Sequence, residues 1–324
     1  MSIRWAAIPV LFLLLGIFAS PLFAQFEKIQ PPESEGDLIL GEAQTTRYQV
    51  GMRVSAERGE SINIYGTIPV PADWPEQTVK IVEEDISPNV GRIQYRMLEG
   101  TVKQMMVSIP RLGPGEVATA IITLEVEKRS AKPPAETSGL AVPRRVPLAM
   151  RRYMGMSPYI EARHGEIRSQ AKKITADLET DWERIEAIYD WVRENVEYTK
   201  MQPTTALTAM REGKGDFEDL TGLFIALCRA EGFPTRTVWI PNSSYAEFYL
   251  EDEEGKGQWY PCLVAGNRAF GEMPDNRPIL LKGDNFRVPE KKEPVRFVSE
   301  YLNAKAGRFG GKPKVEFIRE VVGS

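Results

Sequence analysis

Residues 213–232 read GKGDFEDLTGLFIALCRAEG, and this stretch determines the fold of the second half of the chain. Asp216 and Asp219 have the spacing of a capping box, in which each side chain accepts a hydrogen bond from the other residue's backbone amide. The apolar residues after them recur at helical spacing: Leu220, Leu223, Phe224 and Leu227. Gly232 then favours the end of a helix. The stretch therefore predicts an amphipathic helix that carries Phe217 in its first turn.

The segments on both sides of this helix predict further helices and a small sheet. Downstream lie three short apolar runs that are typical of strands: 234–240, 243–250 and 258–261. Upstream, Thr180 and Glu183 form another capping box. The apolar stripe of a helix follows that box: Trp182, Ile185, Ile188, Tyr189, Val192 and Val196. The run from Ile160 to Leu178 predicts one more helix.

The first half of the chain has a different pattern. From about Thr46 to Glu127, short runs of alternating apolar and polar residues are separated by Gly, Pro and Asp, as in a β-sandwich. Residues 128–150 are rich in proline and favour a linker. We therefore expect an α+β protein with this order of parts: N-terminal β-sandwich 25–127, linker 128–150, helix-and-sheet domain 151–270 and C-terminal extension 271–324.

Residues 1–24 have the pattern of a secretory signal peptide. Arg4 supplies a positive charge, an apolar run from Trp5 to Phe18 follows, and Ala24 suits the position before a cleavage site. A retained anchor helix is the alternative. No later run approaches the roughly 18 apolar residues that span a bilayer, so we expect no membrane span after cleavage. The protein is therefore predicted to be exported to the periplasm, the cell envelope or the extracellular space.

Composition narrows the range of ligands. The chain has 41 Lys and Arg against 45 Asp and Glu, and neither sign is concentrated, which argues against nucleic acid as a partner. Cys228 and Cys262 lack the spacing of a zinc site, and the acidic loop 251–257 fits a hairpin turn better than a calcium site. We expect no metal and no cofactor. The single histidine, His164, is interpreted as a solvated helix residue rather than an acid–base group.

The stretch 213–232 and the runs after it resemble the transglutaminase-like superfamily. This family contains protein-crosslinking transglutaminases, related thiol peptidases and peptide N-glycanases, all with a papain-like core. Its Gly-x-Cys loop matches Gly215-Asp216-Phe217, which places Phe217 at the position of the catalytic cysteine. The resemblance spans about residues 160–263. It implies a papain-like core in which helices pack on a small antiparallel sheet.

Two other catalytic positions follow from the same resemblance. The family's second strand reads His-Ala-Trp-Val-Glu-Val-Tyr, and alignment on Glu247-Phe248-Tyr249 places Ser243 at the histidine position. Its third strand reads Trp-x-Pro-x-Asp, and alignment on Trp259-Tyr260-Pro261 places Leu263 at the position of the acid. All three catalytic positions therefore depart from the family pattern.

These departures remove the chemistry that the family performs. A thiolate is its nucleophile, and a helix N-terminus and a neighbouring imidazolium lower the pKa of that thiol. Phe217 has no nucleophilic atom, and Ser243 cannot by itself pass a proton to a leaving group. We therefore predict a catalytically silent pseudoenzyme that binds a protein or peptide in the former catalytic cleft.

Two alternatives stay open. An active thiol acyltransferase or peptidase could use Cys262 as a displaced nucleophile, but strand neighbours point to opposite faces, so Cys262 faces away if Leu263 faces the site. Cys228 lies about three turns deeper in the helix and is interpreted as core. The same alternation argues against a disulfide between the two cysteines, because it places them in different layers. The second alternative is a structural envelope protein with a closed cleft.

Overall fold

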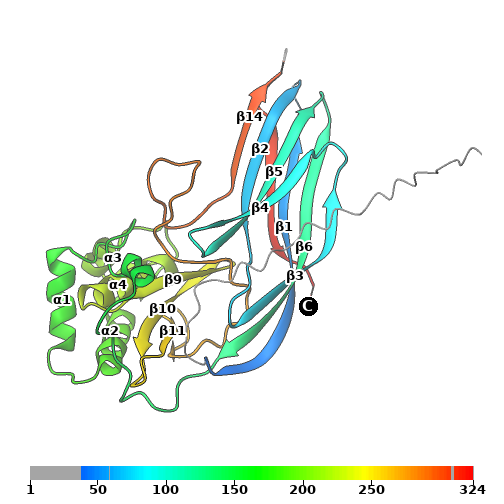
Figure 1. Cartoon of the computed structure of the whole chain (residues 1–324). Coiled ribbons are helices and arrows are strands. Elements are labelled where there is room, and N and C mark those ends of the chain that lie inside the picture. The colour runs from blue at the N-terminus through cyan, green and yellow to red at the C-terminus, as the bar shows by residue number, and fades with distance from the viewer. Residues whose placement is uncertain (1–37, 58, 308–309, 324) are drawn as a thin grey trace, which may run out of the picture.

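The chain forms a β-sandwich and a lobe in which helices cover a further sheet (Figure 1). The computed structural model describes residues 38–57, 59–307 and 310–323, so the predicted signal peptide at 1–24 lies outside the described residues. Within the described ranges, no helix has the length and apolar character needed to cross a membrane. The α+β class predicted from the sequence is the class observed.

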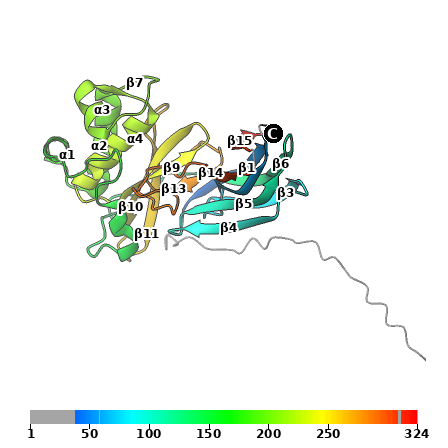
Figure 2. The same cartoon turned by 90° about the horizontal axis from the view of Figure 1, so that it is seen from above.

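The sandwich consists of two antiparallel four-stranded sheets, with strand orders β15-β1-β6-β3 and β14-β2-β5-β4. The strands are β1 (Leu40–Ser55), β2 (Ser61–Val70), β3 (Gln77–Ile86), β4 (Arg92–Leu98), β5 (Val102–Leu112), β6 (Val117–Ala131), β14 (Tyr301–Ala306) and β15 (Lys314–Val321). Because side chains alternate in face along a strand, Val50, Met52 and Val54 of β1 enter the core between the sheets. Seen from above, the helices lie to one side of both sheets (Figure 2).

The last two strands of the chain complete this sandwich. β14 pairs with β2, where Tyr301 lies opposite Thr67, and β15 pairs with β1, where Val321 lies opposite Tyr48. The prediction of a C-terminal extension is therefore wrong for β14 and β15, which belong to the first domain. The physical reason is that these pairings join residues far apart in sequence, and no local pattern signals them. The helical lobe is thus an insertion between β6 and β14.

The second lobe contains the helix predicted from residues 213–232. Its helices are α1 (Gly165–Thr175), α2 (Asp181–Asn195), α3 (Ala206–Glu212) and α4 (Phe217–Ala230). Its sheet has the order β12-β11-β10-β9-β13, with strands β9 (Thr235–Ile240), β10 (Ser243–Glu251), β11 (Gly257–Leu263), β12 (Ala269–Phe270) and β13 (Leu281–Lys282). A parallel pair, β7 (Glu197–Tyr198) and β8 (Lys214–Gly215), precedes α4. The helix predicted from Ile160 begins only at Gly165, because His164 is its N-cap.

Helices α2 and α4 cover one face of this sheet. Both predicted capping boxes are present, Thr180 with Glu183 on α2 and Asp216 with Asp219 on α4. The apolar stripes of the helices meet the helix-facing side chains of β10 in one core, which includes Ile185, Leu223, Phe224, Ala246 and Phe248. The opposite face of β10 points toward the sandwich through Tyr245, so the sheet is buried on both faces.

A buried ion cluster joins the sheet to the sandwich. We define it by Glu76 before β3, Arg236 on β9, Glu247 on β10 and Lys282 on β13. The ammonium group of Lys282 lies 2.6 Å from Glu76 Oε1 and 2.6 Å from Glu247 Oε1, and Arg236 lies 2.6 Å from Glu247 Oε2. Burial alone would raise the pKa of Glu247, but the charges of Arg236 and Lys282 outweigh burial and hold that pKa below its usual value.

We expect Lys282→Met to destabilise the protein by about 3–5 kcal/mol, because it leaves two buried carboxylates without their shared cation. Arg53→Met is the matched control, since Arg53 forms a solvent-exposed pair with Glu316 and should cost no more than about 1 kcal/mol. Urea unfolding followed by tryptophan fluorescence measures both values. Equal losses in the two variants would show that the cluster contributes no more than a surface pair.

Candidate functional site

Hydrogen bonds from its own backbone amides and from the amide of Thr204 fix the first turn of α4. Asp216 Oδ1 accepts from two backbone amides of that turn, at 2.8 and 3.0 Å, and Asp219 Oδ2 accepts from the amide of Asp216 at 3.1 Å. The other oxygen of Asp219 accepts from the amide of Thr204 at 2.7 Å. Gly215 has no room for a side chain, since a Cβ there would lie 2.6 Å from the Cβ of Asp219. Phe217 is therefore fixed as the first, half-buried residue of the helix.

Strand β10 turns Ser244, rather than Ser243, toward α4. Ser244 is buried, and its Oγ lies 3.4 Å from Oγ1 of Thr221, about one helical turn after Phe217. Because side chains alternate along a strand, Ser243 shares a face with Tyr245, whose ring packs toward the sandwich. The residue that the family pattern aligns with histidine thus does not face the helix, while its neighbour does.

The end of β11 shows the same alternation. Cys262 lies opposite Ala246 and faces the helices, whereas Leu263 packs against the cluster between the sheet and the sandwich. The expectation that the two cysteines lie in different layers is wrong, because the helix-facing positions of the sheet include Cys262. Cys228 of α4 lies in that same core, and both cysteines are free thiols. Ser243 and Leu263 therefore lie on the face of the sheet turned away from α4.

A small pocket lies beside the first turn of α4. Its lining includes Tyr159, Glu218, Ser244, Asp284 and Arg296. The room open to the centre of a water molecule there is about 10 Å³, enough for a single water. The guanidinium of Arg296 lies 2.5 Å from Glu218 and 4.3 Å from the centroid of the Tyr159 ring. Burial raises the pKa of Glu218, and the positive charge of Arg296 opposes that rise.

A buried ion pair supports the same pocket. The Asp284 carboxylate accepts two hydrogen bonds from Arg229, at 2.9 and 2.8 Å, one from Ser157 Oγ at 2.7 Å and one from the amide of Thr237 at 3.2 Å. Neither Asp284 nor Arg296 belongs to a sequence motif. They reach α4 because the chain passes over it between β13 and β14, which only the pairing of the last strands reveals.

A family model and one solved structure agree with this fold. The family model of the Transglutaminase-like superfamily matches residues 168–262. Residues 168–262 form a transglutaminase-like domain. The "putative cysteine protease" from Cytophaga hutchinsonii has a similar structure, with a TM-score of 0.55, 16% sequence identity and coverage of 87% of this chain and 94% of that one. The "putative protease" from Parabacteroides distasonis gives a TM-score of 0.29, 11% identity and coverage of 71% and 48%. No curated protein matches the chain.

The structural similarity to the Cytophaga hutchinsonii protein extends beyond the transglutaminase-like domain. Because it covers 87% of this chain, it includes strands of the sandwich as well as the helical lobe. The predicted combination of N-terminal strands and a transglutaminase-like core is therefore confirmed. The matched residues of the family include Phe217 and Ser243 and stop one position before Leu263.

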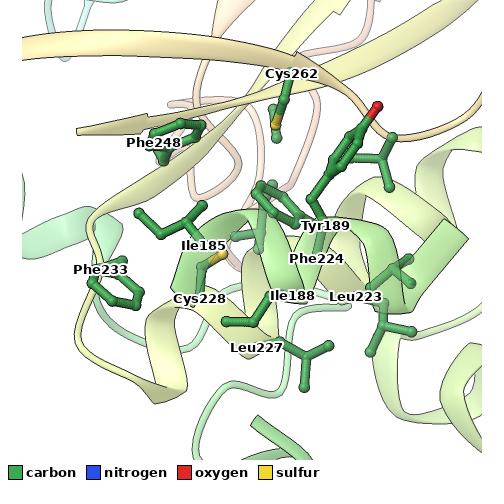
Figure 3. Close-up of a cluster of buried hydrophobic side chains, with 14 of the residues drawn as sticks. Ile185, Ile188, Tyr189, Leu223, Phe224, Leu227, Cys228, Phe233, Phe248 and Cys262 are labelled. Carbon is green, nitrogen blue, oxygen red and sulfur yellow. The ribbon is translucent and has the colours of Figure 1, made fainter. Parts of the chain in front are cut away.

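Both thiols of the transglutaminase-like domain are enclosed in its core. Figure 3 shows Cys262 pointing from its strand toward α4, where Cys228 lies among Ile185, Phe224 and Phe233. Both side chains are fully buried. Burial raises the pKa of each thiol well above its usual value, which disfavours the nucleophilic thiolate. Cys262 is thus poorly suited to act as a displaced nucleophile.

The single histidine has a structural contact at the start of α1. His164 is the N-cap of that helix, and its Nδ1 accepts a hydrogen bond from the amide of Glu166 at 3.3 Å. The residues around the pocket beside α4 do not include it. In the part of the chain that the structure describes, no cluster of His, Cys, Asp and Glu is suited to a metal ion.

We expect neither native cysteine to react with an alkylating reagent near neutral pH. Because access requires opening of the core, labelling should be slower than in the denatured chain by a factor on the order of 1,000 or more. Mass spectrometry after labelling counts the modified thiols. Phe217→Cys is the positive control, since a half-buried thiol at a helix N-terminus should be activated and react in the folded protein. Rapid native labelling of Cys262 in the unaltered chain would contradict this expectation.

Proposed function

We propose that this chain is an exported pseudoenzyme whose transglutaminase-like domain binds a protein or an extended peptide at the former active site. The observation that carries the proposal is Phe217 at the first residue of α4, where the family's nucleophile stands. The helix still presents its positive end there, but a phenyl ring has no atom that this field could activate. Two core thiols and a capping histidine offer no replacement.

Accessible aromatic side chains around the first turn of α4 support a binding role. Tyr198 is 52% exposed and pairs with Gly215, two residues before Phe217. Tyr159 is 48% exposed and lies beneath the guanidinium of Arg296. Its backbone is in the left-handed region, with φ of 69°, in the tight turn closed by backbone hydrogen bonds between Ser157 and Ile160. Aromatic and arginine side chains are enriched where proteins bind one another.

The pocket limits how such a partner would bind. Because it has room for about one water, it is too small to accept a peptide side chain in its present shape. The partner is therefore expected to lie across Tyr159, Tyr198 and Phe217, which we call the aromatic surface.

The proposal of export rests on the signal-peptide pattern of residues 1–24. Enclosure of both cysteines is compatible with free thiols in an oxidising compartment, because oxidants reach them poorly.

A structural envelope protein is the second candidate. The specific observation in its favour is the pairing of Arg296 with Glu218, which closes one side of the pocket. In that case the aromatic surface would have no partner of its own, and both lobes would act as scaffolding. Binding experiments separate the two candidates.

Restoration of the family's cysteine and histidine tests whether their replacement explains the proposed lack of catalytic activity. The unaltered chain should not incorporate a fluorescent amine into casein, and Cys262→Ser should change nothing. Phe217→Cys with Ser244→His should give more activity than Phe217→Cys with Ser243→His, because Ser244 faces α4 and Ser243 does not. Incorporation by the unaltered chain that is lost in Cys262→Ser would overturn the pseudoenzyme proposal.

Selection from a displayed peptide library tests the aromatic surface. Peptides that bind the full chain should lose about 30-fold in affinity for Phe217→Ala or Tyr198→Ala, the loss typical of a central aromatic contact. Val82→Ala is the control, because Val82 is 46% exposed on β3 of the sandwich. Enrichment of no peptide, or equal losses at Val82, would favour the structural candidate instead.

A further inference from the structure

A turn in front of the transglutaminase-like domain exposes apolar side chains. It leads into the short 3₁₀ helix η1 (Leu148–Tyr153). Leu148 is 80% exposed, more than any other large apolar side chain among the described residues. Its neighbours Pro147 and Ala149 are exposed as well. A single exposed leucine is ordinary on a protein surface, so its meaning depends on the residues around it.

This turn is anchored rather than loose. Met150 and Tyr153 are buried against Tyr249 and Trp259, and the rings of Tyr153 and Trp259 meet edge to face at 5.4 Å. Arg152 forms an ion pair with Glu99 of the turn between β4 and β5. These contacts hold the backbone of η1 against both lobes. Because the anchoring side chains point inward, the apolar tip at Leu148 is presented outward at a fixed place.

Unpaired positive charges lie close to the apolar tip in the sequence. Residues 137–160 contain four arginines and no Asp or Glu, although the chain as a whole has a net charge of −4. Arg144, Arg145 and Arg151 are exposed, and none of them forms an ion pair with another residue that the structure describes. We call residues 144–151 the basic turn. It combines three free guanidinium groups with an exposed leucine within eight positions.

We propose that the basic turn docks on the surface of an anionic lipid bilayer. Guanidinium groups bind phosphate oxygens through paired hydrogen bonds, so Arg144, Arg145 and Arg151 suit lipid headgroups. Leu148 suits the boundary between headgroups and acyl chains, where apolar side chains of peripheral proteins insert. An acidic polymer in water would satisfy the arginines but would leave the apolar tip in water. The combination of charge and apolar tip therefore favours a bilayer.

The expected strength of membrane binding follows from the number of arginines in the basic turn. Each arginine near an anionic membrane surface strengthens binding by roughly fivefold, so three together contribute roughly 100-fold. The contact should weaken at high salt, because screening shortens the range of the attraction to about 3 Å at 1 M ionic strength. This membrane contact does not depend on whether the former active site is silent, since it involves different residues.

An environment-sensitive dye on the tip tests the contact in the full chain. The two native cysteines are buried, so a Leu148→Cys variant can be labelled selectively without denaturant. With vesicles of phosphatidylcholine and phosphatidylglycerol, the dye fluorescence should shift to the blue and increase. Vesicles of phosphatidylcholine alone should leave it unchanged. The same dye on a Val117→Cys variant is the control, because Val117 is exposed in the sandwich and should remain in water.

Charge variants test the role of the arginines. In the labelled Leu148→Cys protein, Arg144→Gln with Arg145→Gln and Arg151→Gln should weaken vesicle binding by roughly 100-fold. The matched control removes three exposed positive charges from α1, and it should leave the affinity within about a factor of three: Arg168→Gln with Lys172→Gln and Lys173→Gln. Both sets of substitutions change the net charge by the same amount, and both leave the N-terminal segment unaltered.

Several results would overturn the proposal. One is an unchanged dye signal with anionic vesicles, and another is an equal signal from the Val117→Cys control. A third is equal weakening by the two sets of charge variants, which would show a general effect of net charge. A response to polyglutamate or DNA in the absence of any response to vesicles would instead assign the basic turn to an acidic polymer.

Discussion

The ammonium group of Lys282 holds the two lobes together, because two buried carboxylates from different lobes share it. Glu76 belongs to the sandwich and Glu247 to the sheet of the transglutaminase-like domain. A charge buried without a partner costs several kcal/mol, so neither lobe can move away from Lys282 without a large loss of stability. The second oxygen of Glu247 binds Arg236, whose guanidinium lies 3.9 Å from the ring centroid of Trp259. The charges are thus balanced within the interface.

The position of Lys282 also determines how the chain covers the pocket beside α4. The residue ends β13 at the edge of one sheet, and the next strand, β14, lies in the sandwich beside β2. The chain must cross between them, and this crossing brings Asp284 to Arg229 and Arg296 to Glu218. The covering of the pocket is therefore a consequence of strand order, and it requires no separate lid.

Local chemistry explains which features the sequence predicted. The capping boxes of α2 and α4 were predictable because each box depends on residues three positions apart. The sandwich strands were predictable from alternation, but the membership of β14 and β15 was not, because their partners lie at the other end of the chain. Burial of Cys228 follows from helix periodicity. The face of Cys262 could not be known, because alternation gives opposite faces to neighbours without saying which face meets the helices.

The proposed loss of catalysis would involve more of the structure than the nucleophile position alone. A thiol at position 217 would meet the helix N-terminus, yet alternation along β10 places Ser243, aligned with the family's histidine, on the face opposite to Ser244. The facing position is Ser244, whose hydroxyl lies against Thr221 in a buried contact, so an imidazole there would need new space. Arg296 also pairs with Glu218 in the first turn of α4. In the proposed pseudoenzyme, the nucleophile and base positions would both differ from the family pattern, so reversal of one change would leave the other in place.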